Sequence, residues 1–329
     1  MPTRRSMMRQ SAGFLGFTAL SSGAFGSAVH AAQALSVVTT TGMIADAAAR
    51  IGGAQTRVEA LMGPGVDPHA YRQTRTDILA MSRADLVLWH GLYLEAQMEE
   101  FLEDLGRRGT LVAVTDALPR DALIAHTDYA GRYDPHVWMA PELWSEVVLR
   151  IRDALSDLRP DAAAGFAEAA AGYLDDIAAL ERYSREVLET VPAGSRMLLT
   201  AHDAFGYFGT EYGFEVVGIQ GISTESEAGL ARISDLVELI VARDIRAVFV
   251  ESSVSDRNIR ALIEGAASRD HPVVIGGELF SDAMGSPGTY EGTYLGMIDH
   301  NVTTIARALG GTAPRSGRLG QLASVEDQG

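Results

Sequence analysis

The feature that most restricts the fold of this chain is one long helical pattern near its middle. After Pro160 the sequence continues as DAAAGFAEAAAGYLDDIAALERYSREVLETVP, with abundant alanine and no internal proline. Because alanine is the best helix former and proline the strongest breaker, this stretch predicts one unbroken helix, with Asp161 as its N-cap. About thirty helical residues span roughly 45 Å, the width of a domain or more. The helix is therefore either a long surface helix of one domain or a rod that connects two lobes.

Short apolar strand patterns and amphipathic helical patterns alternate on both sides of this helix. The strand candidates before it are 35–41, 57–63, 84–90 and 109–118. The strand candidates after it are 195–202, 214–220, 246–252 and 271–277, and a final helical pattern covers 292–311. Such alternation is typical of parallel sheets covered by helices. It favours the connecting rod, in an α/β fold of two lobes, each with a mostly parallel four-stranded sheet, joined by one long helix.

The same patterns predict where each part of the chain begins and ends. The predicted parts are an export signal at 1–34, an N-terminal α/β lobe at 35–159, the linking helix at 160–191, a C-terminal α/β lobe at 192–311 and a polar tail at 312–329. The tail reads TAPRSGRLGQLASVEDQG. A polar terminal segment of this kind buries little apolar surface, so we expect it to be disordered.

The N-terminus has the composition of a cleavable export signal. A basic segment, TRRSMMRQ, is followed by a short apolar stretch that glycine and serine make too weak for a membrane span. We expect cleavage after Ala31 or Ala34. Arg4 and Arg5 resemble the pair of a twin-arginine signal, and an ordinary secretory peptide fits as well. With no cysteine for lipid attachment, the expected product is a soluble periplasmic protein without membrane insertion.

Composition excludes several kinds of chemistry. The chain has no cysteine, which removes thiolate nucleophiles, disulfides and cysteine-type zinc sites. It also has no lysine, so neither a P-loop lysine nor a Schiff-base lysine is available. The net charge of −16 leaves no basic surface of the kind that nucleic-acid binding requires. An acidic surface suits a protein that handles cations, although acidity by itself mainly reflects solubility.

The tripeptide Asp-Pro-His occurs twice, ending at His69 and His136. Aspartate and proline both favour helix starts, so two helices that begin alike would explain the Asp-Pro part. They would not explain a histidine next in both places. His69, His202 and Asp282 also follow predicted strands, where α/β sheets bind ligands. Three imidazoles and one carboxylate suit a divalent transition metal, although these residues are far apart in the sequence.

Longer segments carry a resemblance to a known family. GPGVDPHAY, DPHVWM, TAHDAFGYFGTEYGFEVVGIQGISTESEAG, VFVESSVSDRNI and LFSDAMG resemble the metal-binding solute receptors of zinc and manganese ABC transporters. The resemblance covers nearly the whole mature chain. It implies two lobes bridged by one long helix, a metal ion held in the cleft between them, and delivery to an ABC permease in the inner membrane by a monomeric receptor. The family's ligand positions match here as His69, His136, His202 and Asp282.

The resemblance is less decisive about which metal is bound. Zinc-dedicated family members usually carry a long histidine-rich loop before the second ligand, and here His126 is the only additional histidine of segment 115–136. This favours Mn²⁺. Some manganese-dedicated members have glutamate where this chain has His202, and a site of three histidines and one aspartate binds zinc more tightly by intrinsic order. We expect Mn²⁺, with Zn²⁺ or Fe²⁺ as close alternatives.

Two functions of other classes compete with the receptor. A secreted metallohydrolase would need an open coordination position and a nearby general base, and neither HExxH nor G-x-S-x-G is present. A scaffold or adhesin would bind metal only incidentally. The receptor is the expectation that we favour, and it implies that the protein is not an enzyme.

Overall fold

The computed structural model describes residues 33–107, 110–126 and 129–323. The predicted export signal lies outside these residues up to residue 32. Residues Ala34–Gly329 form one compact unit. Within the described residues, no helix combines the length and the apolar character needed to cross a membrane.

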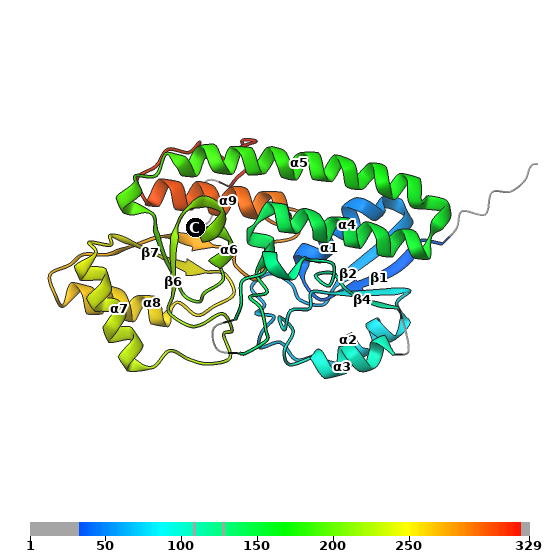
Figure 1. The fold of residues 1–329 in the computed structure, drawn as a ribbon, viewed down its shortest axis with the longest axis horizontal. Coiled ribbons are helices and arrows are strands. Elements are labelled where there is room, and N and C mark those ends of the chain that lie inside the picture. Colours follow the sequence, from blue (N-terminus) through cyan, green and yellow to red (C-terminus); the bar gives the residue numbers. More distant parts are fainter. Residues whose placement is uncertain (1–32, 108–109, 127–128, 324–329) are drawn as a thin grey trace, which may run out of the picture. The chain divides into compact units, whose positions relative to one another are not determined.

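The N-terminal lobe contains a parallel sheet with the strand order β2-β1-β3-β4. Its strands are β1 (Leu35–Thr39), β2 (Thr56–Ala60), β3 (Leu86–Trp89) and β4 (Leu111–Ala113). Its helices are α1 (Gly42–Gly52), α2 (Arg75–Arg83), α3 (Glu99–Gly106) and α4 (Pro141–Leu158). Figure 1 shows α1 and α4 on one face of the sheet and α2 and α3 on the other. Alternate residues of β3 follow this division, since Leu86 and Leu88 pack toward one core, and Val87 and Trp89 toward the other.

The C-terminal lobe repeats the alternation of strands and helices. Its strands are β5 (Met197–Thr200), β6 (Glu215–Gly218), β7 (Ala247–Glu251) and β8 (Val274–Leu279). Its helices are α6 (Gly206–Tyr212), α7 (Leu230–Ala242), α8 (Arg257–Ala267) and α9 (Tyr294–Ala308). All the strands expected from the sequence are therefore present, and each ladder is parallel.

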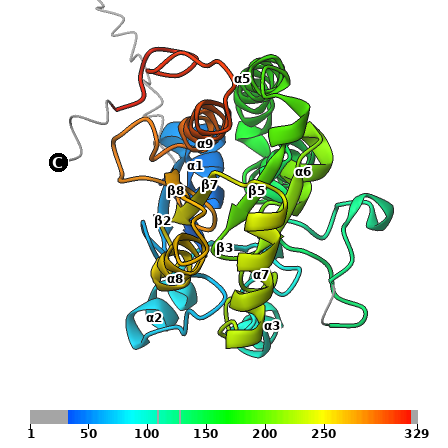
Figure 2. The same ribbon diagram turned by 90° about the vertical axis from the view of Figure 1, so that its left-hand side faces the viewer.

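One detail of the expected C-terminal sheet is wrong. Its strands form two hydrogen-bonded pairs, β5-β6 and β7-β8, rather than one four-stranded sheet. β5 and β7 lie beside each other without a shared ladder, as Figure 2 shows. The pairing of β7 with β8 shifts register between Val248 and Phe249. Such a bulge increases the local twist of the pair.

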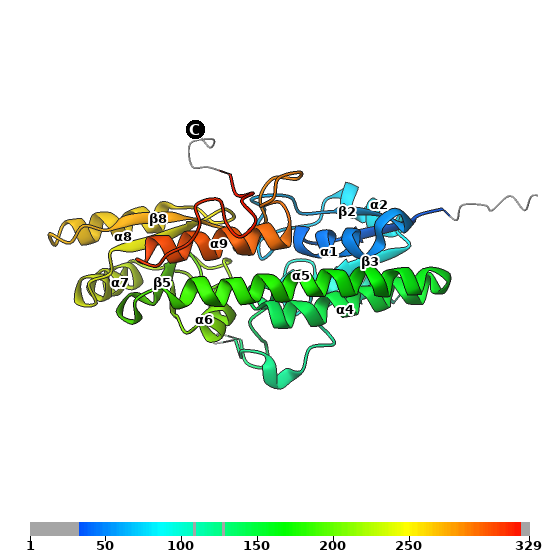
Figure 3. The same cartoon turned by 90° about the horizontal axis from the view of Figure 1, so that it is seen from above.

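The long helix predicted from the alanine-rich stretch is α5 (Ala163–Glu189). It runs along both lobes in Figures 1 and 3, and it packs against α4 and α1 in one lobe and against α9 in the other. A short 3₁₀ turn, Pro160–Ala162, precedes it. The N-cap is Ala162, without a side-chain hydrogen bond, so the expectation that Asp161 caps the helix was wrong. Asp161 falls inside that turn because Pro160 starts it.

A continuous apolar core extends through both lobes along α5. It includes Leu88 of β3, Phe166 of α5, Phe208 of α6 and Phe249 of β7, all of them buried. Two smaller clusters fill the outer faces of the sheets, one beneath α2 and α3 and one beneath α7 and α8. The lobes therefore share a core on the side of α5.

The C-terminal tail is ordered through residue 323, which contradicts the expected disorder for that part. The backbone N–H of Arg318 donates to both carboxylate oxygens of Asp299, at 3.1 and 2.8 Å. The N–H of Ala323 donates to Glu291 at 2.7 Å, and Leu322 is buried. Hydrogen bonds to two buried carboxylates and the burial of one apolar side chain thus fix this part of the tail, although its polar composition predicted no such contacts.

Candidate metal centre

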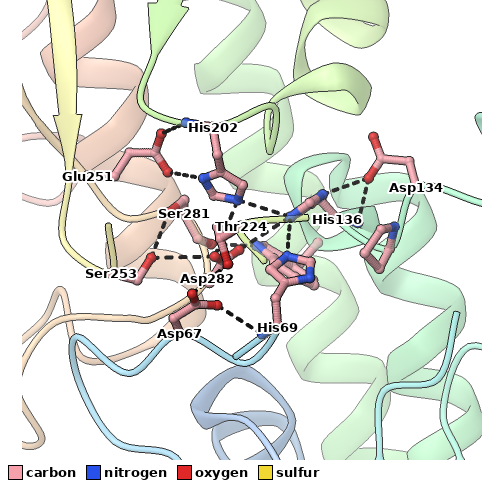
Figure 4. Close-up of polar contacts among 12 residues, drawn as sticks. Asp67, His69, Asp134, His136, His202, Thr224, Glu251, Ser253, Ser281 and Asp282 are labelled. Carbon is pink, nitrogen blue, oxygen red and sulfur yellow. Dashed lines mark hydrogen bonds and ion pairs between the residues drawn. The ribbon is translucent and has the colours of Figure 1, made fainter. Parts of the chain in front are cut away.

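Loops that follow strands bring four distant side chains to one point between the lobes. His69 lies in a turn in the loop after β2, and His136 immediately precedes the 3₁₀ turn Val137–Met139. His202 follows β5, and Asp282 follows β8. All four are buried, at 2, 0, 0 and 2% exposure respectively. Figure 4 shows their side chains pointing toward one another.

The spacing of the donor atoms matches a metal site. One donor atom from each of the four residues lies within 4.8 Å of every other. The Nε2 atom of His136 is 3.3 Å from Nε2 of His69 and 3.3 Å from Nε2 of His202. Ligands about 2.1 Å from a tetrahedral ion are separated from one another by about 3.4 Å. The arrangement therefore fits one ion that all four residues share.

Two of the imidazoles are held by carboxylates on the side away from the centre. Nδ1 of His136 contacts Oδ1 of Asp134 at 2.7 Å, and Nδ1 of His202 contacts Oε2 of Glu251 at 2.6 Å. A carboxylate partner places the proton of a neutral imidazole on Nδ1, which leaves the lone pair of Nε2 free to bind metal. Two such lone pairs facing each other repel unless a cation or a proton lies between them.

Asp282 offers both of its carboxylate oxygens to the centre. Oδ1 lies 3.3 Å from Nε2 of His136, and Oδ2 lies 3.3 Å from Nε2 of His202. Oδ1 is buried and accepts no hydrogen bond. A buried carboxylate oxygen without a donor is costly, and a divalent cation would compensate for that cost. If both oxygens coordinate, the site has five donor atoms.

The ionisation of the four residues reflects their mutual contacts. Burial opposes the charge on His136, but Asp134 and Asp282 outweigh it and raise the pKa of His136 to about 9. Burial is likewise outweighed at His202, where Glu251 and Asp282 raise the pKa well above its ordinary value. Burial also works against ionised Asp282, yet His202 and His136 hold its pKa well below the usual range. His69 differs, since burial and the neighbouring histidines lower its pKa to about 3.

The repeated Asp-Pro-His tripeptide forms a tight turn in both places rather than the start of an α-helix. Oδ1 of Asp67 accepts the backbone N–H of His69 at 2.9 Å, and Oδ1 of Asp134 accepts that of His136 at 2.9 Å. This side-chain turn competes with helix formation, which explains why the helix-start expectation fails. In both places this turn directs the histidine side chain toward the centre of the site (Figure 4).

The sequence predicted the four central residues, but not most of the residues that orient them. Asp134 was read only as a helix-start residue, although its place two residues before a histidine is the signal for this turn. Glu251, the last residue of β7, is the partner of the His202 imidazole. Trp138 belongs to the buried core, and its Nε1 also donates to the carbonyl of Ser281 in the other lobe at 2.8 Å. Three of the histidines outside the site, His90, His271 and His300, contact backbone carbonyls.

Comparison with known proteins agrees with this geometry. The family model described as "zinc-uptake complex component A periplasmic" matches residues 37–308. The chain is 47% identical to the manganese-binding lipoprotein MntA of Bacillus subtilis (strain 168), over 84% of this chain and 90% of the relative. It is 44% identical to the zinc-binding protein TroA of Treponema pallidum (strain Nichols), over 87% of this chain and 92% of the relative.

The solved structures show the same fold. The periplasmic zinc-binding protein TroA from Treponema pallidum superimposes with a TM-score of 0.81 at 43% identity, covering 84% of this chain and 99% of that one. The match includes the two-lobed architecture with its long helix. The chain thus belongs to the family of periplasmic component A of zinc-uptake complexes, whose members are substrate-binding transport proteins and not enzymes.

Proposed function

We propose that this protein captures one divalent transition metal ion between its lobes and delivers it to an ABC permease in the inner membrane. His69, His136, His202 and Asp282 are the proposed ligands. The observation that carries the proposal is their convergence: four buried donors from both lobes, all within 4.8 Å of one another. Membership of a substrate-binding family supports the permease as partner.

The four proposed ligands favour tight binding of a metal ion over catalysis at that ion. All four proposed ligands are buried, so the protein itself surrounds the ion, whereas a hydrolytic site keeps a position open for water. The carboxylates behind His136 and His202 supply the orientation and basicity that metal-ligating imidazoles require. Family membership and burial therefore favour the receptor over the metallohydrolase.

We favour Mn²⁺ as the cargo, with Zn²⁺ or Fe²⁺ as the alternatives. Both oxygens of Asp282 face the centre, which favours five donor atoms over the four of tetrahedral zinc. One relative is named for manganese and another for zinc, so the relatives leave both open. Metal analysis of protein purified from its own compartment distinguishes them, since recombinant protein acquires zinc from the medium.

The remaining parts of the proposal concern export and assembly. We propose that residues 1–34 are a cleavable signal, with the twin-arginine pathway as one route, and that the mature protein is a periplasmic monomer with lobes at 35–159 and 192–311. Mass spectrometry of the exported protein tests cleavage after Ala31 or Ala34. Light scattering of the metal-loaded protein tests the monomer.

The ligand assignment is tested by His69→Ala, with His300→Ala as the control. His300 contacts the backbone carbonyl of Glu278 and the ring of Phe280 and is not one of the proposed ligands, so its removal should leave metal binding intact. His69→Ala removes one donor, and calorimetry should show Mn²⁺ and Zn²⁺ affinities at least about 100-fold lower, with the fold retained. Unchanged affinity in His69→Ala would reject the assignment.

A further inference from the structure

The carboxylate of Asp282 faces the centre with both oxygens, although an aspartate side chain rotates easily about its last bond. Oδ1 lies 3.3 Å from Nε2 of His136, and Oδ2 lies 3.3 Å from Nε2 of His202. The torsion about Cβ–Cγ of an aspartate has broad minima, so the position of the backbone alone does not fix the plane of the carboxylate. A further contact must therefore decide whether one oxygen or both reach a bound ion.

That contact comes from the turn that follows β7. The hydroxyl of Ser253 donates to Oδ2 of Asp282 at 3.4 Å, and its oxygen lies 3.1 Å from Oγ of Ser281. A backbone hydrogen bond of 3.0 Å from Ser252 to Leu279 holds the turn beside the end of β8. Figure 4 shows Ser253 and His136 on opposite sides of the Asp282 carboxylate. The hydroxyl therefore approaches the carboxylate from outside the centre.

The chemistry of the three partners fixes the direction of these hydrogen bonds. An ionised carboxylate only accepts hydrogen bonds, so the single hydrogen of the Ser253 hydroxyl points to Oδ2 of Asp282. Ser281 must then donate to Ser253, whose oxygen is left as the acceptor. Ser281 is fully buried, which shields its hydroxyl from bulk water. The two hydroxyls thus form a directed relay that ends on one oxygen of a proposed ligand.

The relay and a bound ion can share the same carboxylate. Each carboxylate oxygen has two lone pairs, so Oδ2 of Asp282 can accept a hydrogen bond and still bind metal. Ser253 and Ser281 are not proposed ligands, and their hydrogen bonds can persist when the histidines turn their lone pairs to the ion. Rotation of the carboxylate away from the ion would break the hydrogen bond to Oδ2. The relay therefore favours the orientation in which both oxygens face the centre.

We propose that Ser253 and Ser281 are positioning residues that keep both oxygens of Asp282 on the ion, and that they thereby raise the preference for Mn²⁺ over Zn²⁺. The inference rests on the proposed function. Three imidazoles and two oxygens supply five donor atoms, whereas a single oxygen would leave the four that tetrahedral zinc prefers. Mn²⁺ prefers oxygen ligands and a higher coordination number, so it loses more affinity when one oxygen leaves. Metal selectivity then depends on two hydroxyls that touch no metal.

The experiment compares the Mn²⁺ and Zn²⁺ affinities of the mature protein, measured by competition with a chelator. Ser253→Thr and Ser253→Val have the same shape, and only threonine keeps the hydroxyl. Ser253 borders a cavity of about 190 Å³, which offers room for the added methyl group. Ser253→Val should lower the affinity for Mn²⁺ about 3- to 10-fold, the worth of one hydrogen bond, and change that for Zn²⁺ little. Ser253→Thr should keep the original ratio of the two affinities.

Two further variants separate the relay from a general effect on the turn. Ser281→Ala removes only the donor to Ser253, so it should shift the ratio in the same direction by a smaller factor. Ser252→Ala is the matched control, because the hydroxyl of Ser252 contacts the backbone carbonyl of Ala283 at 3.4 Å and not a carboxylate. Its removal should leave the ratio of the two affinities unchanged.

Co²⁺ gives a readout of the number of ligands that does not depend on affinity. This ion absorbs visible light more strongly with four ligands than with five. Co²⁺-loaded Ser253→Val should therefore absorb more strongly than the original protein, Ser253→Thr or Ser252→Ala. The melting temperature of metal-free Ser253→Val should stay near that of Ser253→Thr.

The outcomes distinguish this inference from the proposed function. An original ratio of affinities in Ser253→Val, with binding lost in His69→Ala, would overturn the positioning role and leave the receptor function standing. Equal losses of Mn²⁺ and Zn²⁺ affinity in Ser253→Val, or an equal change of the ratio in Ser252→Ala, would also overturn it. Undiminished binding in His69→Ala would remove the proposed function itself.

Discussion

At the scale of single residues, the centre is built from imidazoles that carboxylates orient. Each of His136 and His202 has an aspartate or glutamate behind it, so its metal-binding nitrogen faces inward. Such partners strengthen a site without binding the metal, because they fix both the tautomer and the ring angle. Substitution of a partner should weaken the site without removing a donor.

Glu251→Gln tests this dependence. The amide keeps the size of the side chain but has one acceptor oxygen, whereas Glu251 uses Oε1 for the backbone N–H and Oε2 for Nδ1 of His202. We expect metal affinity to fall by about 10- to 100-fold, as measured by calorimetry or chelator competition. Glu215→Gln on β6, which removes an exposed partner of Arg243, should leave affinity as it was. Equal affinities in the two variants would contradict the role of Glu251.

The raised pKa of His136 predicts that protons compete with the metal. Without metal, the proton on His136 stabilises the folded protein below pH 6.5, and this contribution is lost as the pH rises through about 9. Metal must displace that proton, so apparent affinity should rise with pH over the same window. Thermal unfolding with and without Mn²⁺ should show a larger metal-induced shift near pH 9 than at pH 6.5. A shift that shrinks with rising pH would contradict this.

At the scale of elements, the sequence predicted the regular parts well and the connections poorly. The strands and α5 were predictable because apolar periodicity and helix propensity are local properties. The turns at Asp67 and Asp134 were not, since a side-chain hydrogen bond to a backbone two residues away competes with the helix start that the same residues favour. The anchor of the tail depends on Asp299, which lies on a different element. Long-range contacts of that kind leave no local pattern.

The ordered tail should contribute to stability and not to metal binding. Leu322→Ala removes a buried side chain, and we expect it to lower the free energy of unfolding by about 1–3 kcal/mol. Leu319, in the same segment, is 51% exposed, so Leu319→Ala should change little. Metal affinity should be unchanged in both, because neither residue contacts a proposed ligand. Denaturant titration measures the first effect and calorimetry the second. Equal stability of the two variants would show that the tail is not anchored as described.

At the scale of the whole molecule, the shared core predicts cooperative unfolding. Buried side chains of β3, α5, α6 and β7 belong to one continuous cluster, so the lobes are not independent folding units. Scanning calorimetry of the metal-free protein should show a single transition, which metal shifts as a whole. Two separate transitions, of which metal moves only one, would indicate that the lobes unfold independently.

The position of α5 has a consequence for transport. A rod packed along both lobes prevents the wide closure by which many receptors enclose their solute, so the loaded and the empty protein would have nearly the same outline. A permease that distinguishes them would have to sense small differences near the proposed site. A permease that does not distinguish them would be occupied by empty receptors as readily as by full ones, and the rate of uptake would then depend on the fraction of receptors carrying cargo.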